Sequence, residues 1–283
     1  MISLILPTYN ERANIQQTLR RAAAALRKSG EEFELIVVDD ASPDETATIA
    51  EQLQGEVPLR VLRRAGRFGL ATAVVDGWNL ARGDVLGVMD ADLQHPPEIL
   101  ASLFAALQKE AVDLVIASRR IPGGGMGKMP WFRRMAANVA ASLAAFVLPE
   151  TVRGVRDPLS GMFLVRAKLL QTAQLNPVGY KILLEILAKV RCRKIVEVPY
   201  TFDARAAGSS KLGATQVLQY FEHLWRLARS TGQLRRWLRR PSSAPPRKQD
   251  HGGRGFTTRA ATGVEHAAPE DNGAASAPRP PLA

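Results

Sequence analysis

With 283 residues, the chain can hold one large domain or two small ones, and its 46% hydrophobic content suits a globular core. The formal net charge of +11 favours an anionic partner, such as a nucleotide, a nucleic acid or a membrane surface. A single cysteine, Cys192, excludes an intrachain disulfide and favours a reducing compartment. We expect no signal peptide, and no apolar run reaches the roughly 20 residues needed to span a bilayer.

In the first half of the chain, hydrophobic periodicity predicts alternating strands and helices. Strands are expected at 2–6, 33–38, 59–62, 85–89 and 113–118, with helices at about 15–26, from 42, at about 70–81 and from 96. Ser42, Pro43 and Glu45 are typical of a capped helix start, and Gly83 is expected to end the helix before it. The alternation predicts an α/β fold with a mostly parallel sheet and right-handed crossovers.

The pattern is looser after Arg119. A glycine-rich stretch at 123–127 predicts a flexible loop, an alanine-rich run at 131–148 predicts a helix, and 195–200 predicts a late strand. Residues 214–240 predict a long basic amphipathic helix or helix pair. From residue 241 to 283, Pro, Ala, Gly and Ser dominate, so this tail is predicted to be disordered and low in complexity. One folded domain is therefore expected at 1–232, with its C-terminal helix reaching about 240.

Carboxylates follow three of the predicted strands. Asp90 and Asp92 come directly after the apolar run 85–89, Asp40 follows the second strand, and Glu11 follows the first, two residues after Tyr9. An unpaired buried carboxylate is costly, and ligands of open α/β sheets bind at the carboxyl ends of the strands, so we expect one ligand-binding rim. Two acids one residue apart, beside a diphosphate, predict a Mg²⁺ or Mn²⁺ site.

Cations accompany these acids. Arg119 and Arg120 end the fifth strand, and Arg205 and Lys211 lie in a glycine-serine loop that could fold over a diphosphate. An ordinary basic surface loop is the alternative interpretation of that segment. His95 is a candidate general base, but this role is disfavoured because His95 stands beside Pro96 and an anionic acceptor needs no strong base.

The motifs stand in a recognisable order: 7–11 (PTYNE), 38–44 (VDDASPD), 90–96 (DADLQHP), 118–119 (SR), 157–161 (DPLSG) and 205–212. Over about residues 1–232 the chain resembles family 2 inverting glycosyltransferases of the GT-A fold, and more closely their polyprenol-phosphate mannosyltransferase branch. The resemblance implies a Rossmann-like sheet. It also implies transfer of a hexose, with inversion, from GDP-mannose to a polyprenyl monophosphate.

The resemblance further implies roles for single residues. A nucleoside and sugar pocket would involve Pro7, Tyr9, Glu11, Val38, Asp40, Met89, Asp90, Ala91 and Asp157. The divalent ion would be held by Asp90, Asp92 and Gln94. Phosphate contacts and catalysis would fall to Asp92, Arg119, Arg205 and Lys211, joined by Arg133 or, as we prefer, Arg134. Met162-Phe163 departs from the usual residues after Ser160-Gly161, and the transmembrane segments of many bacterial relatives are missing.

The polyprenyl acceptor predicts peripheral association with anionic lipids at the cytoplasmic face of the membrane. Two segments suit this role: 131–148, with Arg133 and Arg134 at one end, and the C-terminal helix, in which Val217, Phe221, Leu224, Trp225 and Ala228 form an apolar stripe. The alternative is that these faces pack on the domain itself. A separate membrane-spanning subunit is compatible with the sequence.

Three other functions are compatible with parts of this sequence. A related transferase using UDP-glucose or UDP-N-acetylhexosamine is the alternative within enzymes, because nucleoside selectivity depends on pocket shape. An inactive relative is a remote alternative. A nucleic-acid-binding protein is disfavoured, because aromatic content is 6% and the acids line the ligand rim.

Overall fold

The computed structural model describes residues 1–203 and 213–233, which form part of one compact unit extending to Arg240. Arg205, Lys211 and the predicted disordered tail at 241–283 lie outside the described residues. Domain boundaries beyond 233 therefore stay predictions.

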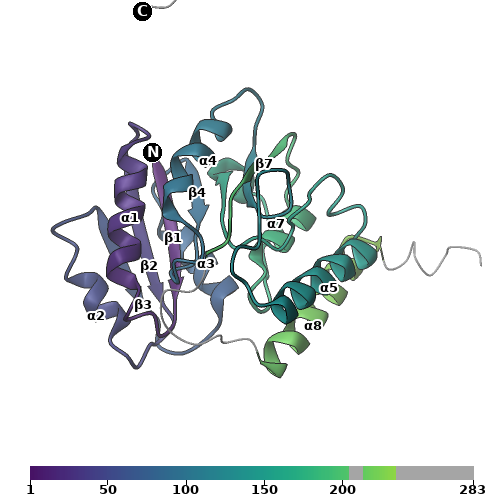
Figure 1. The fold of residues 1–283 in the computed structure, drawn as a ribbon, viewed down its shortest axis with the longest axis horizontal. Coiled ribbons are helices and arrows are strands. Elements are labelled where there is room, and N and C mark those ends of the chain that lie inside the picture. The colour runs from purple at the N-terminus through teal and green to yellow at the C-terminus, as the bar shows by residue number, and fades with distance from the viewer. Residues whose placement is uncertain (204–212, 234–283) are drawn as a thin grey trace, which may run out of the picture. The chain divides into compact units, whose positions relative to one another are not determined.

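A seven-stranded sheet organises this unit, with the strand order β3-β2-β1-β4-β6-β5-β7 (Figure 1). The strands are β1 (Ile2–Thr8), β2 (Phe33–Asp39), β3 (Leu59–Arg63), β4 (Val85–Val88), β5 (Leu114–Ser118), β6 (Phe163–Arg166) and β7 (Ile195–Pro199). Only β6 is antiparallel to its neighbours, β4 and β5. The predicted mostly parallel α/β sheet is confirmed, and six strands present their carboxyl ends at one edge.

Helices cover both faces of the sheet because its strands carry apolar side chains on each face. The helices α1 (Ile15–Arg27), α2 (Thr46–Glu51) and α4 (Leu100–Leu107) pack on one face with Leu4, Leu35 and their neighbours. On the other face, α3 (Leu70–Leu80) and α7 (Ile182–Lys189) pack against Ile5 and Ile36. A short 3-10 turn, Pro97–Ile99, precedes α4, and α6 (Ala167–Leu170) follows β6.

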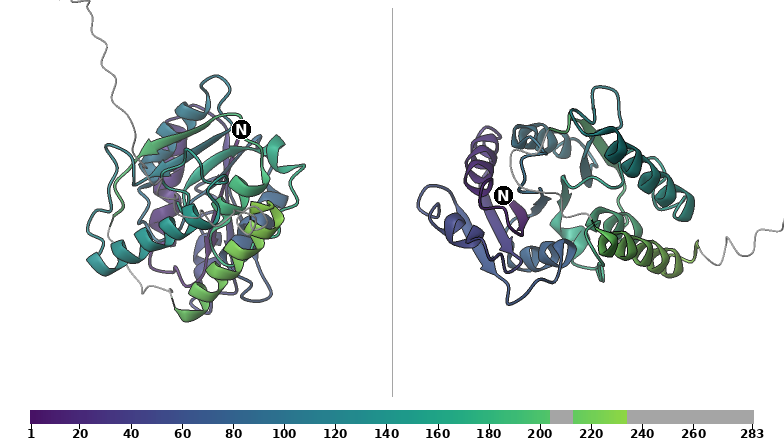
Figure 2. Two further views of the ribbon diagram at one scale, coloured as in Figure 1. Left: turned by 90° about the vertical axis from the view of Figure 1, so that its right-hand side faces the viewer. Right: turned by 60° about the horizontal axis from the view of Figure 1, so that its bottom comes forward.

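Two more helices form a separate layer beside the sheet. The helices α5 (Trp131–Val147) and α8 (Ala214–Ser230) lie side by side (Figures 1 and 2). The Tyr220 hydroxyl of α8 donates to the Ala140 carbonyl of α5 at 2.6 Å. Their shared core includes Ala144, Leu224 and Leu184 of α7. Among the described residues, no helix is both long enough and apolar enough to cross a membrane.

Several local predictions need correction. The second helix begins at Thr46, not at Ser42. The Ser42 hydroxyl instead donates to Asp39 at 2.6 Å and accepts the Asn10 backbone N–H at 2.9 Å, so it joins two loops. Glu45 is the N-cap residue of this helix, and the preceding Asp44 accepts the Thr46 backbone N–H at 3.1 Å. The strand β6 and the helices α6 and α7 were not predicted.

Gly83 has a different role from the predicted helix terminator. The helix α3 ends at Leu80, three residues earlier. A Cβ on Gly83 would lie 2.8 Å from both the Met1 carbonyl oxygen and the Ser3 nitrogen. Only glycine therefore lets this loop pass close to β1.

The predicted flexible loop at 123–127 is held by backbone hydrogen bonds. Gly125 donates to the Tyr200 carbonyl and accepts the Phe202 N–H, at 3.0 and 2.9 Å. A Cβ on Gly127 would collide with the Phe202 carbonyl oxygen. These contacts tie the segment after β5 to the segment after β7.

Candidate active site

The carboxyl edge of the sheet gathers most of the predicted site residues. Because β1, β2, β4 and β5 are parallel, the segments that follow them meet there, carrying Glu11, Asp40, Asp90 and Arg119. The antiparallel β6 enters from the same edge, so the preceding loop brings Asp157 beside Arg119. A single unpredicted strand thus explains how residues 38 positions apart come together.

Asp90, Asp92 and Gln94 form the turn after β4. The Asp90 carboxylate rests against Gly161, where a Cβ would lie 2.5 Å from its Oδ2, and the Asp90 side chain is 31% exposed. Asp92 is buried and accepts the Gln94 backbone N–H at 3.1 Å. Within residues 1–203 and 213–233, no three His, Cys, Asp or Glu side chains gather closely enough to hold a metal alone.

This donor set fits a divalent ion that takes its other ligands from a bound diphosphate and water. Carboxylate and amide oxygens are hard donors of the type that Mg²⁺ and Mn²⁺ accept, and Mg²⁺ commonly uses one or two carboxylates plus substrate phosphates. Gln94 is also joined to Asp203, the last described residue before 213: its carbonyl accepts the Asp203 N–H at 2.9 Å, and its side-chain nitrogen donates to the Asp203 carbonyl at 3.4 Å.

Arg119 and Asp157 form a buried bidentate pair. The Arg119 Nε and Nη2 donate to the two Asp157 oxygens at 2.7 and 2.8 Å, and its backbone N–H donates at 3.0 Å. Burial would raise the pKa of Asp157, but these bonds outweigh it and hold that pKa below its ordinary value. Burial would likewise lower the pKa of Arg119, and the bonds to Asp157 raise it instead. Both groups are therefore charged at neutral pH, and the guanidinium has a fixed orientation.

Asp40 is engaged by the loop after β3. Its Oδ1 accepts from Arg64 at 2.7 Å and from the Phe68 backbone N–H at 2.9 Å, while its Oδ2 accepts the Gly69 N–H at 2.8 Å. In the same loop, the Arg67 guanidinium lies 4.1 Å from the centre of the Tyr9 ring. The predicted nucleoside residues Tyr9 and Asp40 are thus joined to a basic loop that was not predicted as part of the site.

Other predicted contact residues lie deeper. Val38 and Met89 are fully buried, and their side chains belong to the two sheet cores. Ala91 is also buried, and its carbonyl accepts from the Thr18 hydroxyl at 2.9 Å. Pro7 is buried within β1. Any ligand contact of Val38 or Met89 would use the backbone.

In contrast to these buried residues, Arg134 is exposed to solvent on the first turn of α5, and Arg133 beside it is half-buried. The nearest observed link from α5 to the rim is made by Arg120, whose Nη2 donates to the Ala137 carbonyl at 3.0 Å. The structure therefore does not bring Arg134 into contact with the Arg119–Asp157 pair.

His95 is fully enclosed beneath the rim. Its ring stacks on Tyr200, with centroids 5.4 Å apart, and meets Phe202 edge-on. Neither ring nitrogen of His95 has a hydrogen-bond partner, and burial lowers its pKa to about 3. A histidine that stays neutral at physiological pH and lies among aromatic rings is a poor general base, in agreement with the sequence argument.

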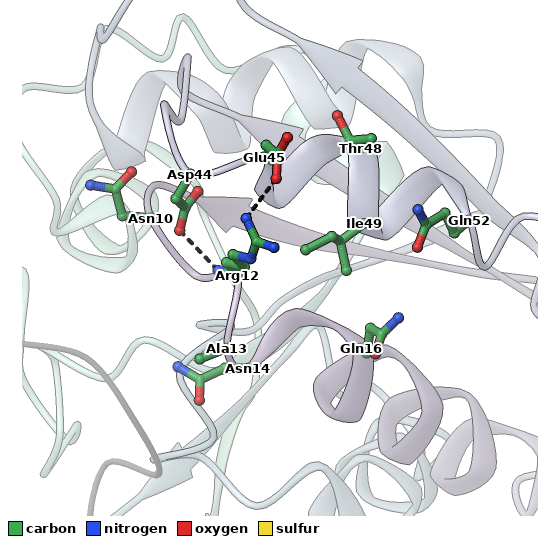
Figure 3. Close-up of a pocket in the computed structure, with 10 residues that line it drawn as sticks. All are labelled: Asn10, Arg12, Ala13, Asn14, Gln16, Asp44, Glu45, Thr48, Ile49 and Gln52. Atoms are coloured by element: carbon green, nitrogen blue, oxygen red, sulfur yellow. Dashed lines mark hydrogen bonds and ion pairs between the residues drawn. The ribbon is translucent and has the colours of Figure 1, made fainter.

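A surface groove lies apart from these residues. It has a volume of about 700 Å³, and residues from 10–16 and 44–52 line it, between the starts of α1 and α2 (Figure 3). Arg12 crosses the groove to pair with Glu45, and its backbone N–H bonds Asp44 (Figure 3). None of the predicted site residues lines it. The rim of the sheet, not this groove, is the candidate active site.

Lys181 was missed by the sequence analysis. It lies just before α7, and its Nζ donates to the Leu159 carbonyl at 3.0 Å, within the loop that holds Asp157. The apolar run 182–187 next to it has helical spacing and could have indicated α7. Nothing in the local sequence indicates that Lys181 reaches the rim, because β6 and the 157–161 loop determine its position.

Comparison with known proteins settles the family. The family model described as glycosyl transferase family 2 matches residues 3–172. The chain belongs to glycosyl transferase family 2. It is 42% identical over 235 residues to a dolichol-phosphate mannosyltransferase of Pyrococcus furiosus, an alignment that covers 83% of this chain and 66% of that protein. The chain therefore spans about two thirds of the length of that archaeal relative.

Other relatives of this family-2 chain match over more of their length. An undecaprenyl-phosphate mannosyltransferase of Micrococcus luteus is 38% identical over 219 residues, covering 74% of this chain and 86% of that protein. A dolichol-phosphate mannosyltransferase of Saccharomyces cerevisiae is 36% identical over 233 residues, covering 78% and 85%.

Solved structures agree on the GT-A fold. Glucosyl-3-phosphoglycerate synthase of Mycobacterium tuberculosis, in complex with Mn²⁺, UDP-glucose and phosphoglyceric acid, gives a TM-score of 0.61 at 24% identity, covering 82% of this chain and 79% of that chain. Mannosyl-3-phosphoglycerate synthase of Rubrobacter xylanophilus gives 0.63 at 20% identity, covering 83% and 75%. At such identities the likeness supports the fold alone.

Proposed function

We propose that this chain transfers a mannosyl residue from GDP-mannose to a polyprenyl monophosphate, with inversion at the anomeric carbon, at a membrane surface. The observation that carries the proposal is the rim itself, where two carboxylates suited to a metal–diphosphate lie near an arginine clamped by a buried aspartate. The names of the relatives, all polyprenol-type phosphate mannosyltransferases, support this acceptor class and sugar.

The metal site assigned to Asp90, Asp92 and Gln94 belongs to this proposal. A bound Mg²⁺ or Mn²⁺ would act as a Lewis acid, neutralising charge on the departing nucleoside diphosphate. Asp90 and Asp92 would supply carboxylate oxygens to it, and Gln94 its amide oxygen. A solved structure with the same fold holds Mn²⁺ together with UDP-glucose, which supports divalent metal use by this chain.

In the proposed reaction, a phosphate oxygen of the lipid attacks the anomeric carbon, and the bond from that carbon to the diphosphate oxygen breaks. A single displacement of this kind inverts the configuration and releases GDP. The lipid phosphate is already an anion at neutral pH, so the neutral His95 has no proton to accept. Arg119, held by Asp157, would orient and stabilise phosphate charge in the transition state, and we assign Arg205 and Lys211 the same task.

The helices α5 and α8 are proposed to contact the membrane. The predicted stripe on α8 divides in the structure: Leu224 and Ala228 are buried against α5, whereas Val217, Phe221 and Trp225 are about half exposed. On α5, Trp131, Met135 and Val139 recur every four residues and are 73%, 55% and 62% exposed. One side of α8 is therefore packed on the domain itself, and the exposed side is the part proposed to contact the membrane.

Charge on the same helices supports a lipid surface rather than a protein partner. Arg226 and Arg229 lie on α8, and the Arg229 guanidinium sits 5.5 Å from the centre of the Trp225 ring. An aromatic belt with adjacent arginines suits the headgroup level of an anionic bilayer, where each basic residue contributes roughly 1 kcal/mol.

A donor panel tests the function. Purified protein is incubated with Mn²⁺ or Mg²⁺, polyprenyl phosphate and labelled GDP-mannose, UDP-glucose or UDP-N-acetylglucosamine, and the lipid product is analysed for its sugar and anomeric configuration. We expect a β-linked mannosyl phospholipid from GDP-mannose alone. Transfer only from a UDP-sugar would replace the donor assignment, and no transfer from any donor would favour an inactive relative.

A further inference from the structure

Lys181 occupies a fixed position at the rim. Before it, Gly179 has a left-handed backbone, with φ +75°, and its carbonyl accepts the Ala71 N–H at 3.1 Å at the start of α3. After it, the Lys181 carbonyl accepts the Leu184 N–H at 3.2 Å in the first turn of α7. These backbone bonds fix Lys181 between α3 and α7, where its side chain reaches the loop that holds Leu159.

The groups that contact the Lys181 ammonium directly are uncharged. It donates one hydrogen bond, to the Leu159 carbonyl at 3.0 Å, and lies 4.8 Å from the centre of the Tyr180 ring. No carboxylate of the described residues forms an ion pair with it within 4.0 Å. The described contacts therefore use one of its three N–H donors.

Charged groups surround it at longer range. Burial and the nearby charge of Arg119 together lower the pKa of Lys181 to about 8, although Asp90 and Asp157 act in the opposite direction. Asp157 is already neutralised by the bidentate Arg119, and Asp90 is assigned to the divalent ion. A partly buried cation without an ion pair at contact distance is unfavourable unless an anion joins it.

We propose that the Lys181 ammonium binds an anionic phosphate oxygen of a substrate at the reaction centre. The inference rests on the proposed function and extends it, because it adds a cation beside the 157–161 loop, within electrostatic range of Asp90 and Arg119. Two phosphates have the required chemistry: the diphosphate of the nucleotide sugar and the monophosphate of the lipid acceptor.

Substitutions at Lys181 test this proposal. Lys181→Met keeps the length of the side chain and removes the charge, whereas Lys181→Arg keeps the charge. We expect Lys181→Met to lower kcat/KM at least about tenfold, equal to about 1.4 kcal/mol of transition-state stabilisation, with an unchanged melting temperature. Lys181→Arg should recover most of the loss. Lys109→Met, an exposed lysine in the turn before β5, is the matched control and should behave as wild type.

Binding measurements identify the phosphate. GDP is titrated into each protein with Mn²⁺ by calorimetry, and the KM for a short prenyl phosphate is measured separately. A weaker GDP affinity in Lys181→Met assigns the ammonium to the diphosphate, and a raised acceptor KM with unchanged GDP affinity assigns it to the lipid phosphate.

The proposal is overturned if Lys181→Met matches wild type in kcat/KM, in GDP affinity and in acceptor KM. It is also overturned if Lys181→Met and Lys181→Arg lose activity equally, because charge would then not matter. Should the wild type transfer no mannose, calorimetric titrations of GDP and of the short prenyl phosphate into the same variants still test Lys181 independently of the proposed function.

Discussion

The edge of the sheet and the α5–α8 pair differ in which side chains they bury. At the edge, the charged groups Asp40, Arg119 and Asp157 are largely buried and bonded to fixed partners. On α5 and α8, the large apolar side chains Trp131 and Leu218 are 73% and 70% exposed. The charged side chains at the edge are therefore fixed in position by their partners. The α5–α8 pair instead exposes a large apolar surface of the kind that a lipid environment covers. This contrast agrees with the proposal that the sheet edge binds the nucleotide sugar, whereas the α5–α8 pair contacts the membrane that holds the lipid acceptor.

The largest expected effect at the edge comes from Asp92→Asn. Losing a carboxylate ligand should lower kcat by a hundredfold or more, equal to about 3 kcal/mol of transition-state stabilisation. Initial rates with GDP-mannose measure the loss, and Glu110→Gln, an exposed acid before β5, is the control. Full wild-type activity in excess chelator would contradict the metal assignment.

A buried carboxylate on α7, Glu185, holds α8 of the helix pair in place through His223. It accepts from His223 of α8 at 2.9 Å and from the Asn176 backbone N–H at 2.9 Å, and it pairs with Lys189. Glu185→Gln should lower the free energy of unfolding at pH 7 by about 1–3 kcal/mol, because charged hydrogen bonds are lost in a buried site. Urea unfolding measures this, with the exposed Glu222→Gln as control.

The same residue predicts a pH dependence. Burial would raise the pKa of Glu185, but the bonds from His223 and Lys189 dominate and lower it to about 2, from an ordinary value of 4.5. The unfolded state therefore binds a proton first as the pH falls, so the stabilisation is complete above about pH 4.5 and declines towards pH 2. The stability difference between wild type and Glu185→Gln should shrink between pH 6 and pH 3. A constant difference would contradict this account.

A smaller effect is expected from the loop that carries Arg205 and Lys211. Each change to Ala should lower kcat/KM by about tenfold without changing the melting temperature, since each removes one charge-assisted phosphate contact. Steady-state kinetics with GDP-mannose measures both variants. Unchanged kinetics in both variants would contradict a role in phosphate binding and would favour the alternative interpretation, an ordinary basic surface loop.

The smallest effect is expected beyond the helix pair. Removing residues 241–283 should leave transfer to a detergent-dispersed polyprenyl phosphate unchanged, because this segment has too few large apolar residues to build a core. Removing 213–283 is the contrasting cut and should abolish folding, since Leu224 and Leu227 of α8 are buried. A large loss of transfer in the shorter truncation would contradict the domain boundary.

The two regions also differ in how far the sequence predicted them. The strands and helices before Ser118 repeat a simple βα pattern, so the positions of Asp40, Asp90 and Arg119 at one edge followed from periodicity. The strand β6 interrupts that pattern with four residues running in the opposite direction, and periodicity cannot specify its insertion between β4 and β5. The Arg119–Asp157 pair and the position of Lys181 depend on that insertion, so neither contact was predictable.

On α8, the sequence predicted an apolar stripe but not how it divides. Leu224 and Trp225 are adjacent in the chain, yet one is 2% and the other 52% exposed. The angular position of α5 beside α8 decides this, and it is a tertiary property. The same limit explains why Ser42 was mistaken for a helix cap, since its hydroxyl is used by a contact with Asn10 from another loop.

The proposal that the α5–α8 pair serves only to reach a membrane-held acceptor is tested most directly by comparing two acceptors with one variant. Trp131, Phe146, Leu218 and Trp225, all more than half exposed, are replaced together by Ser. Transfer of mannose from GDP-mannose is then measured to polyprenyl phosphate in anionic liposomes and to a short water-soluble prenyl phosphate. We predict at least a tenfold loss with liposomes, about 1.4 kcal/mol, and a change within about twofold with the soluble acceptor. Equal losses with both acceptors, or no loss with liposomes, would contradict the account.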